Sequence, residues 1–341
     1  MPEKGCGTDE AATAGLVALA TGAWRQTVLA VAARLDLCAM LGTRAADLEE
    51  VCYSLGTQRL PMRYFLAACA GLGLVEERDA AYALGPLGQA LLAEGGAGLA
   101  AWAEASSDQA LAAALTAVLV EPLLVAPGAP PGATSAVGQW DGASGGALHA
   151  LAAAALAAEL PLEEEGLALE VGGQGVFVRA LLARAAGLRG GLVADASAAG
   201  QATLAGCGQR EAAVTAASGG RAIDERLVVL PTLEGLEARR AHVAVVVQAA
   251  DGGGAAALRK RLTDLRPYLA PGAWVAVVGP FLAAGPVRPL APLLALLALA
   301  AGRSAWCPPV EVVAEHLRAS GYAPTRTLVL PEPDVALLAR G

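Results

Sequence analysis

The sequence predicts an α/β protein in which a mostly parallel sheet, covered by helices on both faces, follows a smaller helical domain. Three observations support this prediction. Apolar residues recur at helical spacing before residue 160, short apolar runs alternate with helical stretches after it, and the 341-residue length suits two domains of about 150 residues each. Buried strands that alternate with helices are typical of parallel sheets. We expect a helical domain over 1–100, a helical linker over 101–160 and the sheet domain over 161–341.

The N-terminal domain is predicted to contain short helices followed by a small hairpin. Apolar side chains recur at helical spacing from Trp24 to Leu37 and again over 60–72. Residues 74–84 alternate around a polar turn, which predicts two short strands. Helices followed by such a hairpin form a winged-helix layout. We expect the hydrophobic first helix, 11–33, to be buried against a second subunit, which makes the chain a homodimer.

The charge of the chain argues against nucleic acid as a partner. The sequence carries 24 basic and 32 acidic residues, for a net charge of −8. Affinity for DNA rests largely on basic side chains that neutralise phosphates. The helix that would enter DNA in a winged-helix protein offers only Arg59 and Arg63. We therefore expect no nucleic-acid partner.

The sequence also lacks a predicted membrane segment. Although 55% of the residues are hydrophobic, the longest uncharged apolar stretch lies between Arg288 and Arg303. That stretch is shorter than the roughly 20 residues that a membrane-spanning helix needs. Acidic residues near the N-terminus do not fit a signal peptide. We expect a cytoplasmic protein with no membrane partner.

Cysteine and histidine spacing predicts no metal site. The six cysteines form no C-x-x-C pair, and the three histidines are isolated from one another. His149 is expected to pack or to lie on the surface, with a ligand-facing position as the alternative. His242 is expected to pack at the start of a strand, with a catalytic role as the alternative.

The second domain contains seven predicted strands. In chain order they are 167–171, 191–195, 226–230, 242–247, 273–278, 325–330 and 334–338. Helices are predicted among them at 177–186, 255–268 and 310–320, and the Pro- and Gly-rich segment 126–132 before them is predicted to be a loop or hinge. The last two strands are separated only by Pro331-Glu332-Pro333, which is too short for a crossover helix. They should form an antiparallel hairpin at the sheet edge.

The turn after the first of these strands is the candidate binding site. Ligands of open parallel sheets bind beyond the carboxyl ends of the strands. The turn has the sequence E-V-G-G-Q-G over 170–175, and its glycines allow a ligand to approach the backbone at a helix N-terminus. The second strand ends at Asp195, whose carboxylate can accept hydrogen bonds from both hydroxyls of a ribose. This combination indicates a nucleoside cofactor.

Several further motifs occur in one order along the chain. They are the segment 22–37 with its Gly-Ala-Trp start, the hairpin region 72–88, the Leu-Ala-Pro-Gly-Ala run 269–273 and the helix end 316–322. Together they resemble the bacterial and plant small-molecule O-methyltransferases, which use S-adenosylmethionine and dimerise through an N-terminal winged-helix domain. The resemblance runs from about residue 12 to the C-terminus and implies a class I Rossmann-like methyltransferase domain. It also implies a small aromatic or polyketide-like substrate.

The resemblance assigns roles to individual residues. It places Gly172, Gly173 and Gly175 against the methionine part of S-adenosylmethionine and Asp195 against the ribose. The remaining cofactor candidates are Glu170 and Thr232.

On the acceptor side, Gln248 is the substrate-binding candidate and Asp251 is the catalytic candidate. Asp251 stands where the family has a catalytic His. With a reference pKa near 4, against about 6.5 for His, an Asp is a weaker base unless burial raises its pKa. The alternative role for Asp251 is the N-cap of the following helix.

Departures from the family pattern leave three interpretations open. The glycine turn is one residue shorter and carries Gln174, and Pro231-Thr232 replaces the Gly-Asp pair that borders adenine. The chain could be a methyltransferase for a small natural product. It could instead be a repurposed enzyme of the same fold that catalyses cyclisation or rearrangement. The third interpretation is a catalytically inactive partner subunit.

Overall fold

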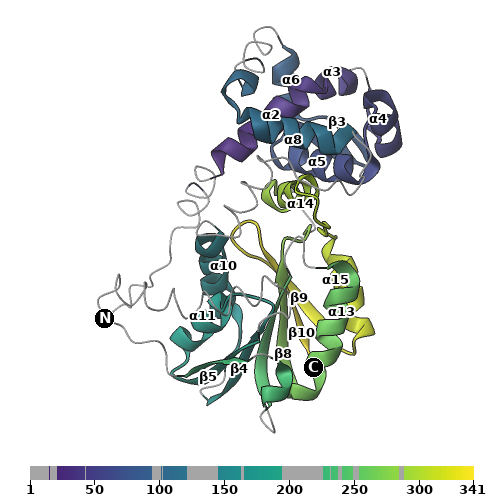
Figure 1. Ribbon diagram of the computed structural model, residues 1–341. Coiled ribbons are helices and arrows are strands. Elements are labelled where there is room, and N and C mark those ends of the chain that lie inside the picture. The colour runs from purple at the N-terminus through teal and green to yellow at the C-terminus, as the bar shows by residue number, and fades with distance from the viewer. Residues whose placement is uncertain are drawn as a thin grey trace, which may run out of the picture. The chain divides into compact units, whose positions relative to one another are not determined.

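The computed structural model divides the chain into two compact units (Figure 1). The first comprises Met1–Gly145, Leu282–Cys307 and Pro331–Pro333, and the second comprises Gly146–Phe281, Pro308–Leu330 and Asp334–Gly341. These units do not coincide with the boundaries expected from the sequence, because two late segments belong to the first unit. The structure describes residues 15, 21–42, 44–93, 101, 103–120, 145–162, 165–193, 226–230, 232–236, 240–248, 253–283 and 288–341.

The first unit contains helices and one small sheet. The helices from the N-terminal part are α2 (Gly22–Arg34), α3 (Leu37–Leu41), α4 (Leu48–Leu55), α5 (Arg59–Gly71), α6 (Pro86–Leu92) and α8 (Gln109–Val120). The strands are β1 (Ala46–Asp47), β2 (Val75–Arg78) and β3 (Ala81–Leu84), in the antiparallel order β1-β3-β2. The predicted helix over 60–72 and the predicted hairpin over 74–84 are thus confirmed. Helix α4 begins at a capping box between Asp47 and Glu50.

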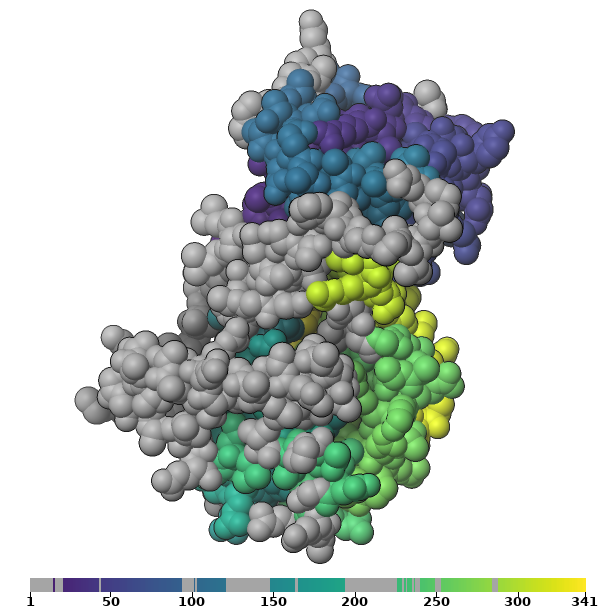
Figure 2. Space-filling view, viewed as in Figure 1, coloured from purple at the N-terminus to yellow at the C-terminus, as the bar shows by residue number. Residues whose placement is uncertain are grey.

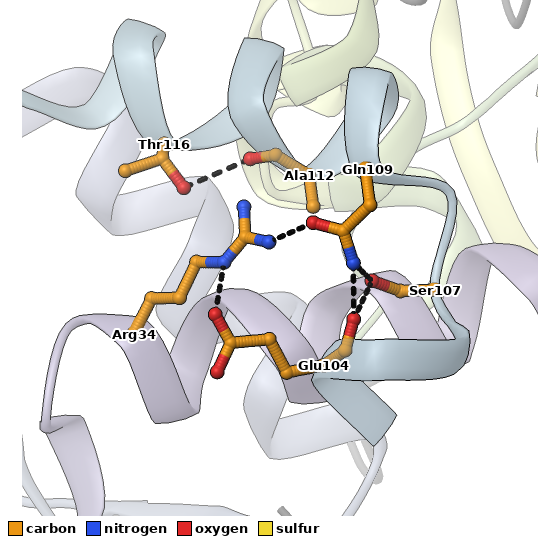
Figure 3. Close-up of polar contacts among 6 residues, drawn as sticks. All are labelled: Arg34, Glu104, Ser107, Gln109, Ala112 and Thr116. Atoms are coloured by element: carbon orange, nitrogen blue, oxygen red, sulfur yellow. Dashed lines mark hydrogen bonds and ion pairs between the residues drawn. The ribbon is translucent and has the colours of Figure 1, made fainter. Parts of the chain in front are cut away.

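Helix α2 is already buried within its own unit. Val28, Ala30 and Val31 are fully buried in the single chain. At the end of the helix, Arg34 donates a 2.8 Å hydrogen bond to Glu104 and another to Gln109 at the start of α8 (Figure 3). One face of the described part of the first helix therefore packs against its own chain, and the burial of this helix against a second subunit stays a prediction.

Two late segments of the chain also belong to the first unit. Helix α14 (Leu290–Ala300) is buried at every position, and Gly71 of α5 lies so close to it that a Cβ there would be 2.6 Å from the nitrogen of Pro289. In the segment Pro331–Pro333, Glu332 lies 3.1 Å from Arg25 and 3.7 Å from Arg288. The apolar stretch noted in the sequence is thus a core helix. No helix among the described residues is both long and apolar enough to span a bilayer.

The second unit is built on a seven-stranded sheet. Its strands are β4 (Glu165–Val171), β5 (Gly187–Val193), β6 (Leu227–Leu230), β7 (Ala241–Val247), β8 (Leu269–Gly279), β9 (Ala323–Val329) and β10 (Val335–Arg340). Their order is β6-β5-β4-β7-β8-β10-β9. The pairs from β6 to β8 are parallel, and β10 is antiparallel to both β8 and β9. The predicted α/β class, the mostly parallel sheet and the C-terminal antiparallel hairpin are confirmed.

Helices cover both faces of this sheet (Figure 1). They are α10 (Gly145–Glu159), α11 (Val176–Arg184), α13 (Gly254–Leu265) and α15 (Val310–Ala319). On one face, Val243 and Val245 of β7 share a core with Leu156 of α10 and Leu181 of α11. The alternate side chains of the same strand, such as Val246, are equally buried. Because β7 is buried on both faces, its sequence is apolar at nearly every position.

Helices α13 and α15 contact each other on the surface of the second unit. Figure 2 shows the green atoms around α13 beside the yellow atoms of the C-terminal residues. The hydroxyl of Tyr322, after α15, donates a 2.8 Å hydrogen bond to the carbonyl of Leu262 in α13. This hydrogen bond joins the end of α15 to α13.

Candidate functional site

The order of the strands reverses between β4 and β7. From β4 the chain passes through α11 to β5, continues outward to β6 and returns to β7 on the other side of β4. Val171 of β4 pairs with Val246 of β7, so the carboxyl ends of both strands lie together. Such a reversal opens a crevice beyond the strand ends, where α/β proteins bind their ligands. The turn 170–175 and Gln248 both lie at this edge.

Glu170 organises the turn. Its side chain is fully buried, and its two carboxylate oxygens accept hydrogen bonds from the N–H groups of Gly175 at 2.8 Å and Val178 at 2.9 Å. The carboxylate therefore satisfies N–H groups at the start of α11 that have no partner within the helix. Burial raises the pKa of Glu170, and the hydrogen bonds from the backbone oppose that rise. The sequence analysis expected this helix N-terminus to face an anionic ligand, but Glu170 holds two of its N–H groups.

The three glycines of the turn are required by the local backbone and its neighbours. Gly172 and Gly175 have φ angles of +80° and +82°, a region that favours glycine. A Cβ at Gly173 would lie 1.9 Å from Oε1 of Glu170 and 2.8 Å from Cγ2 of Val247. Gln174, the remaining residue of the turn after Gly173, is exposed.

Gln248 and Arg261 meet beside this turn. Gln248 follows β7 and is buried, and its backbone N–H donates a 2.8 Å hydrogen bond to the carbonyl of Val278. Arg261 of α13 donates through Nη1 to Oε1 of Gln248 at 3.2 Å and to the carbonyl of Val247 at 3.4 Å. The same guanidinium lies 3.4 Å from where a Cβ of Gly172 would stand.

The sequence analysis missed Arg261. A signal was present, because Arg261 interrupts an apolar stripe of buried leucines on α13 formed by Leu258, Leu262 and Leu265. A cationic side chain on the apolar face of a helix indicates that it makes a polar contact inside the fold.

A second polar pair lies close to the turn. Nδ1 of His149 on α10 is 2.7 Å from Oδ2 of Asp334, the residue that precedes β10. The His149 ring also meets the ring of Phe177 edge-on, with centroids 6.1 Å apart. Burial alone would lower the pKa of His149, but the charge and hydrogen bond of Asp334, together with the charge of Glu170, raise it above its ordinary value. His149 thus pairs with the buried carboxylate of Asp334, a position that the sequence did not reveal.

The other sequence-predicted residues fall in different places. Thr232 follows β6 and is exposed. Asp195 and Asp251 lie outside the described residues, as does the loop 126–132. His242 packs at the amino end of the sheet, where its Nδ1 lies 3.5 Å from the backbone N–H of Leu167, so the expectation of a packed position is confirmed. In the described parts of the chain, no group of three or more His, Cys, Asp and Glu could hold a metal ion.

The fold can be compared with solved structures. An O-methyltransferase family 2 protein from Planctomyces limnophilus, in complex with apigenin, matches 96% of this chain and 95% of its own at a TM-score of 0.63. The chain has the O-methyltransferase fold. A second solved structure, that of LaPhzM, covers 95% of this chain and 98% of its own at a TM-score of 0.51. The sequence identities are 16% and 18%, so the likeness establishes the fold alone.

Sequence comparison adds one curated relative. A segment of 67 residues is 39% identical to the 3-hydroxy-5-methyl-1-naphthoate 3-O-methyltransferase of Streptomyces sahachiroi. The match covers 20% of this chain and 19% of that protein, about a fifth of each. No protein-family model matches the chain.

Proposed function

We propose that this chain transfers a methyl group from S-adenosylmethionine to an oxygen of a small aromatic, polyketide-like molecule. The observation that carries the proposal is the glycine turn at the strand-order reversal, held in shape by the buried Glu170. The O-methyltransferase fold and the naphthoate-methylating relative support the same function.

The residues of the turn fit S-adenosylmethionine. Gly172 and Gly173 are partly accessible, and Gln174 between Gly173 and Gly175 is exposed. Gly172, Gly173 and Gly175 would contact the methionine part, Asp195 the ribose and Thr232 the adenine side. Glu170 would act through the turn rather than by direct contact, because Gly175 and Val178 already donate to its oxygens. The cofactor supplies an electrophilic methyl group on a sulfonium.

The acceptor would lie beside the carboxyl end of β7. Gln248 is proposed to orient it through its side chain, with Oε1 held by Arg261. Asp251 is proposed to lie near the reacting oxygen. Alignment of the two reactants supplies much of the rate in such a transfer, so catalysis does not require Asp251 to act as the base.

Calorimetric titration with S-adenosylmethionine and S-adenosylhomocysteine tests the proposal. We expect the wild-type protein to bind both ligands, and Asp195→Asn to bind about tenfold more weakly, since a hydrogen bond to a charged group contributes about 1.5 to 3 kcal/mol. Glu165→Gln, which changes an exposed acid at the opposite end of the sheet, is the matched control and should bind normally. Absence of heat with either ligand at high micromolar concentration would rule out the proposal.

A non-methylating reaction is the second candidate, and the Asp at position 251 favours it. Incubation with hydroxylated naphthoates distinguishes the two. Formation of S-adenosylhomocysteine with a product 14 mass units heavier supports methylation, whereas turnover that continues without cofactor supports the second candidate.

We also propose that the first unit forms a homodimer. Its described surface carries exposed large apolar side chains at Tyr53, Leu60, Leu87 and Leu92. Light scattering should then give twice the chain mass of 33.9 kDa.

A further inference from the structure

His149 and Asp334 are far apart in sequence, but their side chains form a pair. They are separated by 185 positions, and their side chains lie 2.7 Å apart. Asp334 is fully buried, and its second carboxylate oxygen, Oδ1, has no hydrogen-bond partner among the described residues. A buried carboxylate with an unsatisfied oxygen is costly for a fold. Apolar packing alone does not explain why a buried carboxylate lies beside the imidazole of His149.

The pair lies at the glycine turn. The ring of His149 meets Phe177, which is the second residue of α11 and directly follows the turn. The carboxylate of Glu170, which shapes the turn, is close enough to influence the charge of the ring. Among the described residues, Asp334 before β10 and Glu170 on β4 are the acidic groups that raise the pKa of His149.

The imidazole differs from its partner in access to solvent. The His149 side chain is 27% exposed, whereas the Asp334 side chain is 0% exposed. Asp334 faces Nδ1, which orients the ring so that Nδ1–H donates to the carboxylate and Nε2 is the nitrogen that can accept a proton. A buried carboxylate that orients a histidine and stabilises its imidazolium is a recurring arrangement for a general base.

The geometry points to His149 and Asp334 as the proton-accepting dyad of the reaction, with His149 as the base and Asp334 as its positioning residue. This inference rests on the proposed methyl transfer. Nε2 takes the proton of the acceptor hydroxyl, and an oxygen lone pair forms the new bond to the methyl carbon. The carbon–sulfur bond breaks with both electrons going to sulfur, which neutralises the sulfonium. The resulting imidazolium is balanced by Asp334 and later releases its proton to water.

Kinetics of point variants test the dyad. We expect His149→Gln to lower kcat about 100-fold, the lower end of the usual effect of a general base, with KM and affinity for S-adenosylhomocysteine within twofold of wild type. The acidic limb of the wild-type pH–rate profile should be lost in this variant. His316→Gln, which changes a histidine on α15 outside the site, should leave rate and profile unchanged. Unchanged kcat and an unchanged acidic limb in His149→Gln would overturn the inference.

A measurement without turnover tests the pairing itself. The chain has three histidines, so the ring resonances can be assigned by their loss in single variants. In an NMR titration we expect the pKa of His149 to fall in Asp334→Asn, with that of His316 unchanged. Should Asp334→Asn fail to fold, His149→Gln and Asp334→Glu are compared in its place.

The two experiments separate the inference from the proposed function. A wild-type protein that binds no S-adenosylhomocysteine refutes methyl transfer and, with it, the dyad's part in the reaction. A protein that binds the cofactor and methylates, but in which the pKa of His149 does not respond to Asp334, refutes only the dyad.

Discussion

Individual side chains in the second unit show how the turn is built from within. Glu170 was expected to contact a cofactor, but the structure uses both of its oxygens to hold the N-terminus of α11. The absence of a side chain at Gly173 makes room for that carboxylate. The motif is therefore partly a requirement of the fold, because the acid and the glycine depend on each other before any ligand binds.

The raised pKa of His149 predicts a pH dependence of stability. A group whose pKa is higher in the folded state stabilises the protein fully below its unfolded pKa, near 6.5, and loses that contribution as the pH rises through the folded value. Urea unfolding should therefore show the wild type losing free energy of unfolding relative to His149→Gln as the pH rises above about 6.5.

His316 provides the control for this prediction. Burial is the main cause that lowers the pKa of His316. Its contribution to the free energy of unfolding therefore rises with increasing pH, and it does so only below about pH 6.5. Above that pH, the free energy of unfolding of His316→Gln should change with pH in parallel with that of the wild type. Parallel curves for His149→Gln and the wild type over the same range would contradict the prediction.

At the scale of elements, α14 shows how a late segment completes an early core. Residues 290–300 are uniformly apolar, and every one of them is buried in the first unit. A run without periodicity does not distinguish a core helix from a strand, and it does not show which part of the chain will cover it. The predicted strands of the second unit were easier to identify, since each is bounded by turn residues or charges.

A substitution in α14 should destabilise the first unit. Leu293 is 1% exposed, so Leu293→Ala should lower the free energy of unfolding by about 2 to 5 kcal/mol through lost burial and the cavity that remains. Val120→Ala, at an exposed valine of α8 in the same unit, should change it by less than about 0.5 kcal/mol. Chemical denaturation followed by circular dichroism measures both. Equal effects of the two substitutions would show that α14 is not part of the core.

At the scale of the whole molecule, the two units suggest that ligand binding stabilises one part of the chain selectively. The glycine turn, Gln248 and the His149–Asp334 pair all belong to the second unit. A ligand that binds only the folded state adds about 2.7 kcal/mol at 100 times its dissociation constant. We expect S-adenosylhomocysteine to raise the melting temperature of the transition that involves the second unit.

Differential scanning calorimetry with and without the ligand measures this effect. Gly173→Val places a side chain where Glu170 and Val247 already lie, so it should abolish the ligand-dependent shift. Glu165→Gln should retain it. A shift of the same size in Gly173→Val would exclude the turn as the binding site.

The sequence by itself determined the fold class, most strands of the second unit and the glycine turn, because those features depend on local periodicity and on turn chemistry. It also determined that strands 325–330 and 334–338 pair as a hairpin, since three residues cannot form a crossover. Only the tertiary structure decided that Arg261 reaches Gln248, that α14 belongs to the first unit, and that His149 meets Asp334. Those contacts join segments far apart in the chain, and side-chain pairing across 185 residues leaves no pattern that local spacing can reveal.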